Sequence, residues 1–349
     1  MTQRLRIHLI APAGSCRPFF EPIGVRSAAE LVALAQEAVG GTYQVRANEA
    51  ILEAAEDESR GGRIDDRLRA EDLQQALADP DVVAVVALRG GAWFTRILPL
   101  IDFTVLDRRK RRVAAFGFSE LTSLVNIVGA HPRGLGVYGM GPAFLTYGMK
   151  RHAASQLHAG DLQGVSPEEW MLQRLREEFF AFFRNVTSTI EGRGGVGPLL
   201  ARRVHGELPR PGKVRFIGGN LTVFSAMIGS RYQECIRPKG RWVVLEDFND
   251  KPERFDRFLA HLTLAGYWEE CEGVLLGDFH LGERDLTEAM LAILSYHLPR
   301  GGSFPVLVTS QVGHVWPMTP LPLHVPATLE RADETSVSIR WPAAALCVV

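Results

Sequence analysis

The stretch VAAFGFSELTSLVNIV, residues 113–128, places a serine between two apolar runs. The first run, Val113 to Phe116, predicts a short buried strand that ends at Gly117, and the last run, Leu121 to Val128, predicts a helix. A strand that passes through glycine and serine into a helix puts the hydroxyl of Ser119 on a tight turn at the sheet edge. The first free N–H groups of the helix then point at whatever that hydroxyl attacks. The stretch therefore indicates an α/β architecture and a candidate nucleophile.

A second interpretation of Ser119 is that it caps the helix, because serine is a common N-cap residue. The nucleophile turn of α/β-hydrolases would also need a glycine two residues after the serine, where this chain has Leu121. That superfamily's signature therefore fails, and the stretch taken alone favours the N-cap interpretation.

Strand and helix signals alternate through the first part of the chain. The apolar run Val82 to Leu88 is typical of a strand buried on both faces. Helical periodicity follows residues Ala28 to Ala38 and Asp65 to Ala78. Strands that alternate with helices predict an α/β layer with a mostly parallel sheet.

Changes of character along the chain predict three segments. Residues 1–149 form an N-terminal domain that carries the candidate nucleophile. Residues 150–212 form a connector with an inserted helix over Glu168 to Arg184, and glycine and proline cluster toward its end. Residues 213–349 form a C-terminal domain of further short strands and helices, in which the alternating tail Ser336 to Trp341 is typical of an edge strand.

The composition indicates in which cellular compartment the protein works and which classes of partner it does not bind. The chain has 349 residues and a net charge of −1, so nothing suggests a nucleic acid as partner. No run approaches the roughly 18 apolar residues of a membrane span, and Arg6 to Ala11 indicates a first buried strand rather than a signal peptide. The four cysteines are scattered, as reduced thiols in a cytosolic protein are: Cys16, Cys235, Cys271 and Cys347. We therefore expect a cytoplasmic protein that does not enter a membrane.

Three further segments carry residues that suit hydrolase chemistry. The pair Gly90-Gly91 follows a predicted strand and would let a backbone N–H approach a ligand, although a plain tight turn is the favoured interpretation of the pair by itself. Glu246 and Asp247 end another apolar run, so one could orient a histidine while the other caps the next helix. A pair that only caps a helix or is solvated is a serious alternative. His314 follows a glycine after a further apolar run, and a lone histidine is weak evidence by itself.

Together these residues supply the parts of a serine hydrolase. Ser119 is the nucleophile, His314 can take its proton, and Glu246 can hold the histidine. The N–H groups of Gly91 and Glu120 could stabilise an oxyanion. The ten histidines show neither a metal-binding cluster nor a His-Glu-x-x-His spacing, so we expect no metal and no cofactor.

The chain also resembles the LD-carboxypeptidase family of serine peptidases, which includes murein tetrapeptide carboxypeptidases and microcin C self-immunity peptidases. The resemblance covers nearly the whole chain, from Ala11 to beyond His314. Six blocks in the family's order carry it: Gly90-Gly91 with Leu98-Pro99 and Ile101-Asp102, Gly117 to Leu124, Gly218 to Leu221 with Ile228-Gly229, Leu245 to Asp247 with Asp256-Arg257, Gly273 to Phe279, and Gly313-His314.

The resemblance implies that Ser119 is the nucleophile, Glu246 the orienting carboxylate and His314 the general base, with the amides of Gly91 and Glu120 as the oxyanion hole. It implies a Rossmann-like N-terminal domain and a smaller C-terminal α/β domain with a barrel-like β arrangement. The site would lie in the cleft between them. Members are commonly dimers, so a homodimer is expected.

Three departures from the family pattern bear on specificity. Glu120 stands where aspartate is frequent, and we expect little effect if this residue contributes mainly its backbone N–H. Ala92-Trp93 follows the paired glycines where tyrosine is frequent, which leaves specificity open. The connector is long, as in the microcin-immunity branch, and its Trp170 could stack on a nucleobase or, as we favour, pack the inserted helix onto the domain.

The sequence thus predicts a serine carboxypeptidase that hydrolyses an L,D-type terminal bond of small, murein-derived peptides through an acyl-enzyme on Ser119. The alternative is a microcin-immunity-type serine amidase or peptidase that cleaves aminoacyl-nucleotide or related conjugates. A binding protein without activity is less favoured because all triad residues are present. A nucleotide-binding regulator is disfavoured because no Gly-x-Gly-x-x-Gly follows the first strand. Arg89, Arg96 and Arg257 are all candidates for binding the substrate carboxylate.

Overall fold

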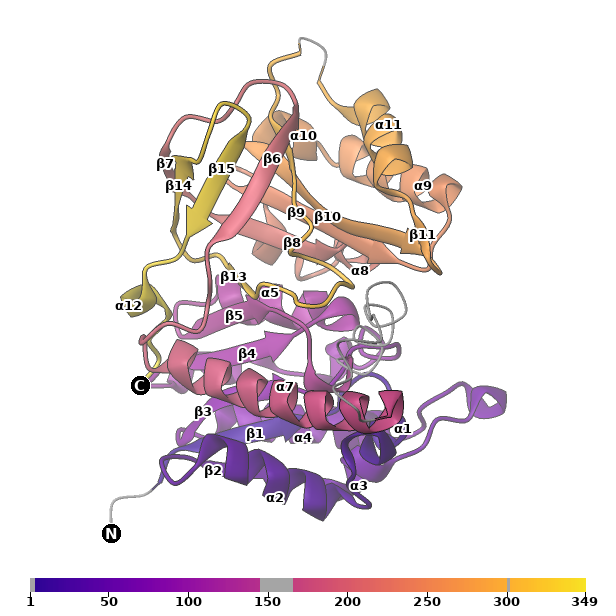
Figure 1. Ribbon diagram of the computed structural model, residues 1–349, viewed down its shortest axis with the longest axis vertical. Coiled ribbons are helices and arrows are strands. Elements are labelled where there is room, and N and C mark those ends of the chain that lie inside the picture. The colour runs from indigo at the N-terminus through magenta and orange to yellow at the C-terminus, as the bar shows by residue number, and fades with distance from the viewer. Residues whose placement is uncertain (1–3, 145–165, 300–301) are drawn as a thin grey trace.

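Two β-sheets organise the computed structural model, which describes residues 4–144, 166–299 and 302–349 (Figure 1). In the first sheet, strands β1 to β5 are parallel, and β13 is antiparallel at one edge. Its strands in spatial order are β13 (Leu321–Leu323), β5 (Gly134–Tyr138), β4 (Val113–Gly117), β3 (Val82–Ala87), β1 (Arg6–Ile10) and β2 (Gln44–Ala47).

The order β2-β1-β3-β4-β5 reverses direction between β1 and β3, which makes that position the switch point of a doubly wound sheet. Ligands of such sheets bind beyond the carboxyl ends of the strands at the switch point. The loops after β1 and β3 meet there, because the N–H of Gly14 donates to the carbonyl of Gly90 at 3.1 Å. All six residues of β3 are buried, so the predicted strand with two buried faces is confirmed.

The second sheet curls into a barrel-like arrangement with parallel strands on one side and antiparallel strands on the other (Figure 1). Its strands in spatial order are β7 (Gly212–Val214), β14 (Ala327–Arg331), β15 (Ser336–Arg340), β6 (Leu199–His205), β12 (Val306–Val308), β10 (Gly273–Leu281), β9 (Trp242–Phe248) and β8 (Phe216–Asn220); β11 (Arg284–Asp285) pairs with β10. The predicted fold class, a Rossmann-like part and a smaller barrel-like α/β part, is confirmed.

Helices cover both sheets, and side-chain caps begin several of them. Ser27 accepts from the N–H of Glu30 at the start of α2, and Ser166 with Glu169 forms a capping box at the start of α7. The α-helices are α1 (Arg17–Phe20), α2 (Ala28–Val39), α3 (Glu49–Glu53), α4 (Asp66–Ala78), α5 (Thr122–Ala130), α7 (Pro167–Ile190), α8 (Leu221–Ala226), α9 (Pro252–Leu264), α10 (Tyr267–Glu270), α11 (Thr287–His297) and α12 (Ala343–Leu346).

The chain crosses between the two halves more often than the three predicted segments suggest. Within residues 150–212, α7 lies along α2 on the first half, whereas β6 joins the second sheet. Near the C-terminus, β13 returns to the first sheet beside β5. The expected boundary at residue 149 and the start of the connector lie outside the described residues.

The tail Ser336 to Trp341 differs from its prediction as an edge strand. Its strand β15 pairs with β14 on one side and with β6 on the other, so it lies inside the sheet. The alternation arises because one face of the curled sheet packs on the core, with Val337 and Ile339 fully buried. Alternation reports a two-sided environment and carries no information about how many neighbours a strand has.

Candidate active site

Ser119 follows β4 on a strained turn. Its backbone has φ +57°, a left-handed conformation that costs a residue with a side chain about 1–3 kcal/mol. A short 3-10 helix, η5 (Ser119–Leu121), begins there and continues into α5. The N-cap interpretation of Ser119 is wrong, because Phe118 occupies the N-cap of η5 and Leu121 that of α5. Strain of this kind is characteristic of residues held for function.

Two glycines allow this turn to form against its neighbours. A Cβ on Gly117 would lie 2.7 Å from the Cβ of Leu121, inside the first helical turn. A Cβ on Gly90 would lie 2.8 Å from the Cβ of Ser119 and 2.8 Å from the carbonyl oxygen of Phe118. The loop after β3 therefore touches the candidate nucleophile directly, at a distance that only glycine permits.

The two predicted oxyanion donors lie on these adjoining segments. Gly91 is exposed and has φ +118°, which favours glycine. The amide of Glu120 lies in the first turn of η5. The first hydrogen bond of that turn runs from the N–H of the next residue, Leu121, to the carbonyl of Phe118. A Cβ on Gly90 would be 3.3 Å from the nitrogen of Glu120, so the two segments are neighbours.

The side chain of Glu120 braces the loop that follows the paired glycines. Its Oε1 accepts from the N–H groups of Phe94 and Thr95 at 3.1 and 3.0 Å, and from the hydroxyl of Thr95 at 3.2 Å. Burial raises the pKa of this carboxyl, and the three donors oppose that rise. The carboxylate thus holds the loop while the backbone N–H of the same residue remains at the turn.

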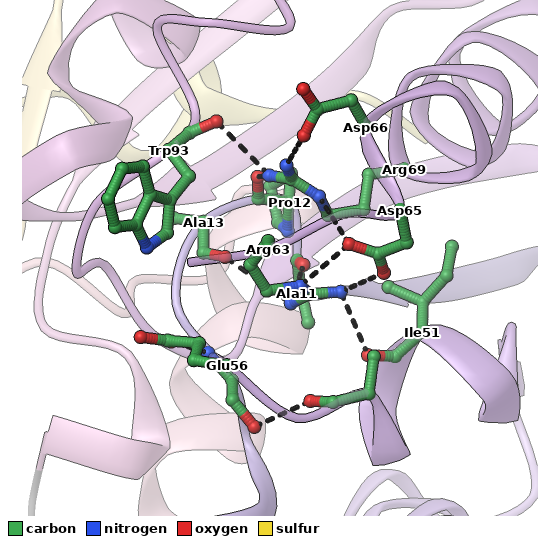
Figure 2. A network of polar contacts seen from close by, with 12 residues as sticks. Ala11, Pro12, Ala13, Ile51, Glu56, Arg63, Asp65, Asp66, Arg69 and Trp93 are labelled. Carbon is green, nitrogen blue, oxygen red and sulfur yellow. Dashed lines mark hydrogen bonds and ion pairs between the residues drawn. The ribbon is translucent and has the colours of Figure 1, made fainter. Parts of the chain in front are cut away.

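A buried arginine network holds the other wall of the switch point (Figure 2). Arg63 donates to the carbonyls of Ala11 and Ala13, and Arg69 donates to those of Pro12 and Trp93. Both guanidinium groups pair with Asp65, whose pKa they hold below its usual value against the effect of burial. Because one network binds carbonyls in the loop after β1 and in the loop after β3, it holds these two loops together.

Glu246 and His314 lie together in the second half. Oε2 of Glu246 is 2.7 Å from Nδ1 of His314, and both side chains are buried. The ring of His314 lies between two phenylalanines, with its centroid 4.5 Å from that of Phe118 and 4.9 Å from that of Phe248. Since Phe118 directly precedes Ser119, this packing brings the imidazole beside the turn that carries the candidate nucleophile.

Glycines also allow His314 to approach the end of β10. Gly313 has φ +118°, and a Cβ there would lie 2.7 Å from the Cβ of Asp278. A Cβ on Gly277 would lie 2.5 Å from the carbonyl oxygen of Val312 and 3.2 Å from the Cβ of Glu246. The sequence blocks around Gly277 and Gly313 therefore serve one close contact between two loops.

Tyr138 completes the site and was missed by the sequence reasoning. Its hydroxyl donates to Oε1 of Glu246 at 2.5 Å and accepts from the N–H of Ser119 at 3.2 Å. Burial, with the charge of Glu246, raises the pKa of this phenol well above its usual value, so it stays a donor. The available signal was its place at the end of β5, where the parallel register sets it beside Gly117.

Two buried polar pairs join the nucleophile helix to the second sheet. The hydroxyl of Thr122 accepts from the N–H of Asn220 at 2.9 Å. The side chain of Asn126 exchanges two hydrogen bonds with the backbone of Gly218, at 2.9 and 3.2 Å. A Cβ on Gly218 would lie 2.0 Å from the carbonyl oxygen of Val244, so this approach also depends on glycine. These contacts hold α5 and β8 in a fixed relation.

Asp247 supports a different helix from the expected one. It was predicted to cap the helix that follows, but it accepts from the N–H and hydroxyl of Thr222 at 2.9 and 2.8 Å, on the preceding helix α8. Burial and the neighbouring charge of Glu246 raise the pKa of Asp247 to about 6.

The three arginine candidates for a substrate carboxylate differ in their surroundings. Arg96 is bound to Asp66 at 2.7 Å and lies over the ring of Trp93. Arg257 is exposed on α9. Arg89 is half-buried beside the paired glycines, with its guanidinium 3.0 Å from where a Cβ on Gly14 would be, and it donates to the carbonyl of Ser15 at 2.8 Å.

The structure also bears on Trp170, on metal binding and on membrane spans. Trp170 is half-buried and packs against the hydrophobic core of the first half. Within the described residues, no group of three or more His, Cys, Asp or Glu side chains could hold a metal ion. No helix in the described part of the chain combines the length and apolar character that crossing a membrane requires.

Comparison with known proteins gives two family matches and several relatives. Residues 7–139 match the LD-carboxypeptidase N-terminal domain and residues 213–329 match the LD-carboxypeptidase C-terminal domain. The murein tetrapeptide carboxypeptidase of Pseudomonas aeruginosa is 28% identical over 257 residues, 69% of this chain and 73% of the relative. A Bacillus subtilis protein named "Probable murein peptide carboxypeptidase" is 25% identical over 279 residues, 79% of this chain and 77% of the relative.

A solved structure of MccF in complex with glutamyl sulfamoyl guanosine shares the fold. Its TM-score is 0.66 at 16% identity, over 97% of each chain. The family matches cover most of the chain in two ordered pieces, and they contain every predicted site residue from Gly91 to His314. The protein therefore belongs to the LD-carboxypeptidase family.

Proposed function

We propose that this protein is a serine carboxypeptidase that removes a terminal residue from small, murein-derived peptides across an L,D-type bond. The observation that carries the proposal is the buried pair of Glu246 and His314, 2.7 Å apart, whose imidazole packs on Phe118 next to the strained Ser119. A carboxylate, an imidazole and a hydroxyl held by separate buried contacts are the parts of a nucleophilic triad.

In this mechanism Glu246 holds Nδ1 of His314, which leaves Nε2 to take the proton of Ser119. The hydroxyl attacks the scissile carbonyl, and the oxyanion is bound by the N–H groups of Gly91 and Glu120. Each such donor is typically worth about 3 kcal/mol of barrier. His314 then protonates the leaving amine and becomes neutral again. The neutral imidazole next takes a proton from a water molecule, and that water hydrolyses the acyl-enzyme on Ser119.

Arg89 is the group we assign to the terminal carboxylate of the substrate. A carboxypeptidase must recognise that carboxylate close to the scissile bond, and a guanidinium binds it with two parallel hydrogen bonds. Arg89 lies beside Gly91, and the hydrogen bond to a neutral carbonyl leaves its charge uncompensated by that partner. Arg96 already pairs with Asp66, and this ion pair argues against Arg96 as the group that binds the substrate carboxylate.

The alternative substrate is an aminoacyl-nucleotide or related conjugate. The same nucleophile, base and oxyanion donors would cleave it, and the fold shared with MccF keeps this alternative open. Two observations favour peptides: sequence relatives carry murein peptide names, and Trp170 packs against the core.

We further propose a cytoplasmic homodimer. The free cysteines support a reducing compartment, and burial raises the pKa of the Cys16 thiol to about 12, which makes it unreactive. The dimer rests on the resemblance to the family, and sedimentation or light scattering tests it.

The substrate proposal is tested by kcat/KM on two compounds, the tetrapeptide L-Ala-D-Glu-meso-diaminopimelate-D-Ala and glutamyl sulfamoyl adenosine. We expect the tetrapeptide to be preferred by at least a hundredfold. Cleavage of the conjugate alone would transfer the assignment to the immunity-type amidase, and cleavage of neither would refute both substrate classes.

A further inference from the structure

A second cavity lies at the opposite end of the strands that carry the active site. Its volume is about 470 Å³, within the roughly 300–1,000 Å³ of small-molecule sites. Arg112 on its wall directly precedes β4, whereas Ser119 follows that strand. Arg241 directly precedes β9, whereas Glu246 lies toward the end of it. At about 3.3 Å per residue, β4 separates its two ends by roughly 16 Å, so the cavity is distinct from the active site.

The residues that line this cavity include basic side chains and no carboxylate, and the lining His131 pairs with Asp107 outside the cavity at 2.9 Å. Six titratable side chains line it, and all are basic: Arg112, His131, Arg215, Lys239, Arg241 and His324. In the described part of the chain, neither the three arginines nor the lysine forms an ion pair. Arg112 donates to the carbonyls of Gly134, Ala345 and Cys347, and Arg241 to that of Arg237, so neutral oxygens position these charges without cancelling them.

Two of the arginines that line the cavity lie close enough to repel each other. The pKa of Arg241 is lowered by burial and by the charge of Arg215 nearby. Like charges at close range repel each other more strongly beside a protein wall than in bulk water. A bound anion would remove this repulsion, and the guanidinium fork suits phosphate oxygens in pairs.

His324 adds a second, independent observation. Its Nε2 is buried and has no hydrogen-bond partner within the described residues, whereas such atoms usually have one. Its backbone has φ +63°, another strained conformation for a residue with a side chain. Burial and the charge of Arg241 lower the pKa of His324 to about 3, so the ring is neutral at pH 7 and adds no positive charge to the wall.

We propose that this cavity is a binding site for a phosphate group, either free phosphate or a phosphomonoester, held by Arg112, Arg215, Lys239 and Arg241. We favour phosphate over a carboxylate as the ligand because a phosphate carries close to two negative charges at neutral pH, whereas a carboxylate carries one. The ligand would contact residues from both halves of the molecule, because Arg112 adjoins the first sheet and Arg215 and Arg241 adjoin the second. Binding would therefore also stabilise the junction between the halves.

The test is calorimetric titration of the full chain with inorganic phosphate and with phenyl phosphate, at constant ionic strength. The variant is the double substitution Arg215→Ala with Lys239→Ala, because both side chains are exposed and their removal should leave the fold intact. The matched control is Lys213→Ala with Arg340→Ala, which removes the same charges from exposed positions elsewhere. Thermal unfolding without phosphate checks that both variants are folded, and Arg215→Gln alone replaces the double variant if it is not.

We expect saturable binding by the wild type and the control, at least tenfold weaker binding by the variant, and a rise in Tm with phosphate only where binding persists. Tighter binding of phenyl phosphate would identify an ester as the ligand, and equal or tighter binding of inorganic phosphate would identify the free ion. The absence of saturable binding, or equal weakening in the variant and the control, would overturn the proposal.

Discussion

The phenol of Tyr138, from the first sheet, lies 2.5 Å from the carboxylate of Glu246, from the second. The same hydroxyl accepts from the backbone N–H of Ser119, and the other oxygen of the carboxylate contacts His314. One buried tyrosine thus connects the backbone of the candidate nucleophile to the group that orients the candidate base. The relation between the two halves of the molecule is thereby coupled to the geometry of the site.

Replacing Tyr138 with phenylalanine should impair catalysis through Glu246. Hydrogen bonds to charged groups contribute about 1.5–3 kcal/mol, so kcat should fall by about tenfold to a hundredfold with KM little changed. The carboxylate would then favour the protonated imidazole more strongly, so the acidic limb of the pH–rate profile should move to higher pH. Steady-state kinetics across pH 5–9 measures both effects.

The matched control for this substitution is Tyr267→Phe. That hydroxyl is also buried but donates to the neutral carbonyl of Ile236, at 3.1 Å. The control should leave kcat and the pH profile unchanged. Equal losses in the two variants would mean that Tyr138 has only a structural role.

Asp247 should make stability depend on pH between about 4 and 6. Its pKa is raised from 3.8 to about 6 in the folded protein, so the folded state binds the proton more tightly than the unfolded state. Stability therefore falls as pH rises through this window, and the contribution is lost above about pH 6. Asparagine at position 247 cannot ionise, so the variant Asp247→Asn lacks this pH dependence. Between about pH 4 and 6, the free energy of unfolding of the wild type should fall by roughly 2–3 kcal/mol relative to that of the variant.

Urea unfolding of the two proteins at pH 4, 5, 6 and 7 measures this difference. Other titrating groups cancel in the comparison because both proteins carry them. A difference that stays constant with pH, or that changes in favour of the wild type as pH rises, would show that folding does not raise the pKa of this carboxyl.

Gly90→Ala should disable the site while leaving the protein folded. The new Cβ would lie 2.8 Å from that of Ser119, so the turn or the loop must shift. Misplacement of a catalytic group by about 1 Å can cost a hundredfold in rate, and overpacking typically costs about 1–3 kcal/mol of stability. Gly197→Ala is the control, because no atom lies within 4 Å of a Cβ there. Wild-type activity in Gly90→Ala would remove this loop from the site.

Arg89→Met should abolish the preference for a free terminal carboxylate. The wild type is expected to cleave a tetrapeptide far better than the same peptide with a terminal amide, and the variant should treat the two alike. A rise in KM for the free acid of at least tenfold is expected, since a charge-assisted pair is lost. The matched control is Arg257→Met on the exposed face of α9. A preference retained by Arg89→Met and lost by the control would exchange their roles.

The sequence predicted those parts of the fold and site that depend on local pattern. The strand–glycine–serine–helix stretch located Ser119, because chain direction and the end of a strand are local properties. The pair of Glu246 and His314 came together as expected, although the residues are 68 positions apart, because each follows an apolar run that ends at the same region. The resemblance to a family supplied the order in which these pieces belong together.

The parts that escaped prediction depend on contacts between distant segments. Tyr138 ends β5 in an ordinary apolar run, and only the register of β4 with β5 shows that it reaches Ser119 and Glu246. The strained φ of Ser119 cannot be read from its sequence, which favoured a helix cap. Strand β15 was placed at an edge because sequence alternation does not reveal that β6, more than 130 residues earlier in the chain, pairs with its second side.

The most direct measurement is the rate of D-alanine release from L-Ala-D-Glu-meso-diaminopimelate-D-Ala by the wild type and by Ser119→Ala. The account predicts release by the wild type and a loss of about 10³-fold or more in the variant, because removal of a triad nucleophile leaves only the oxyanion donors and binding. Equal rates of release from the two proteins would contradict the assignment of Ser119 as the nucleophile.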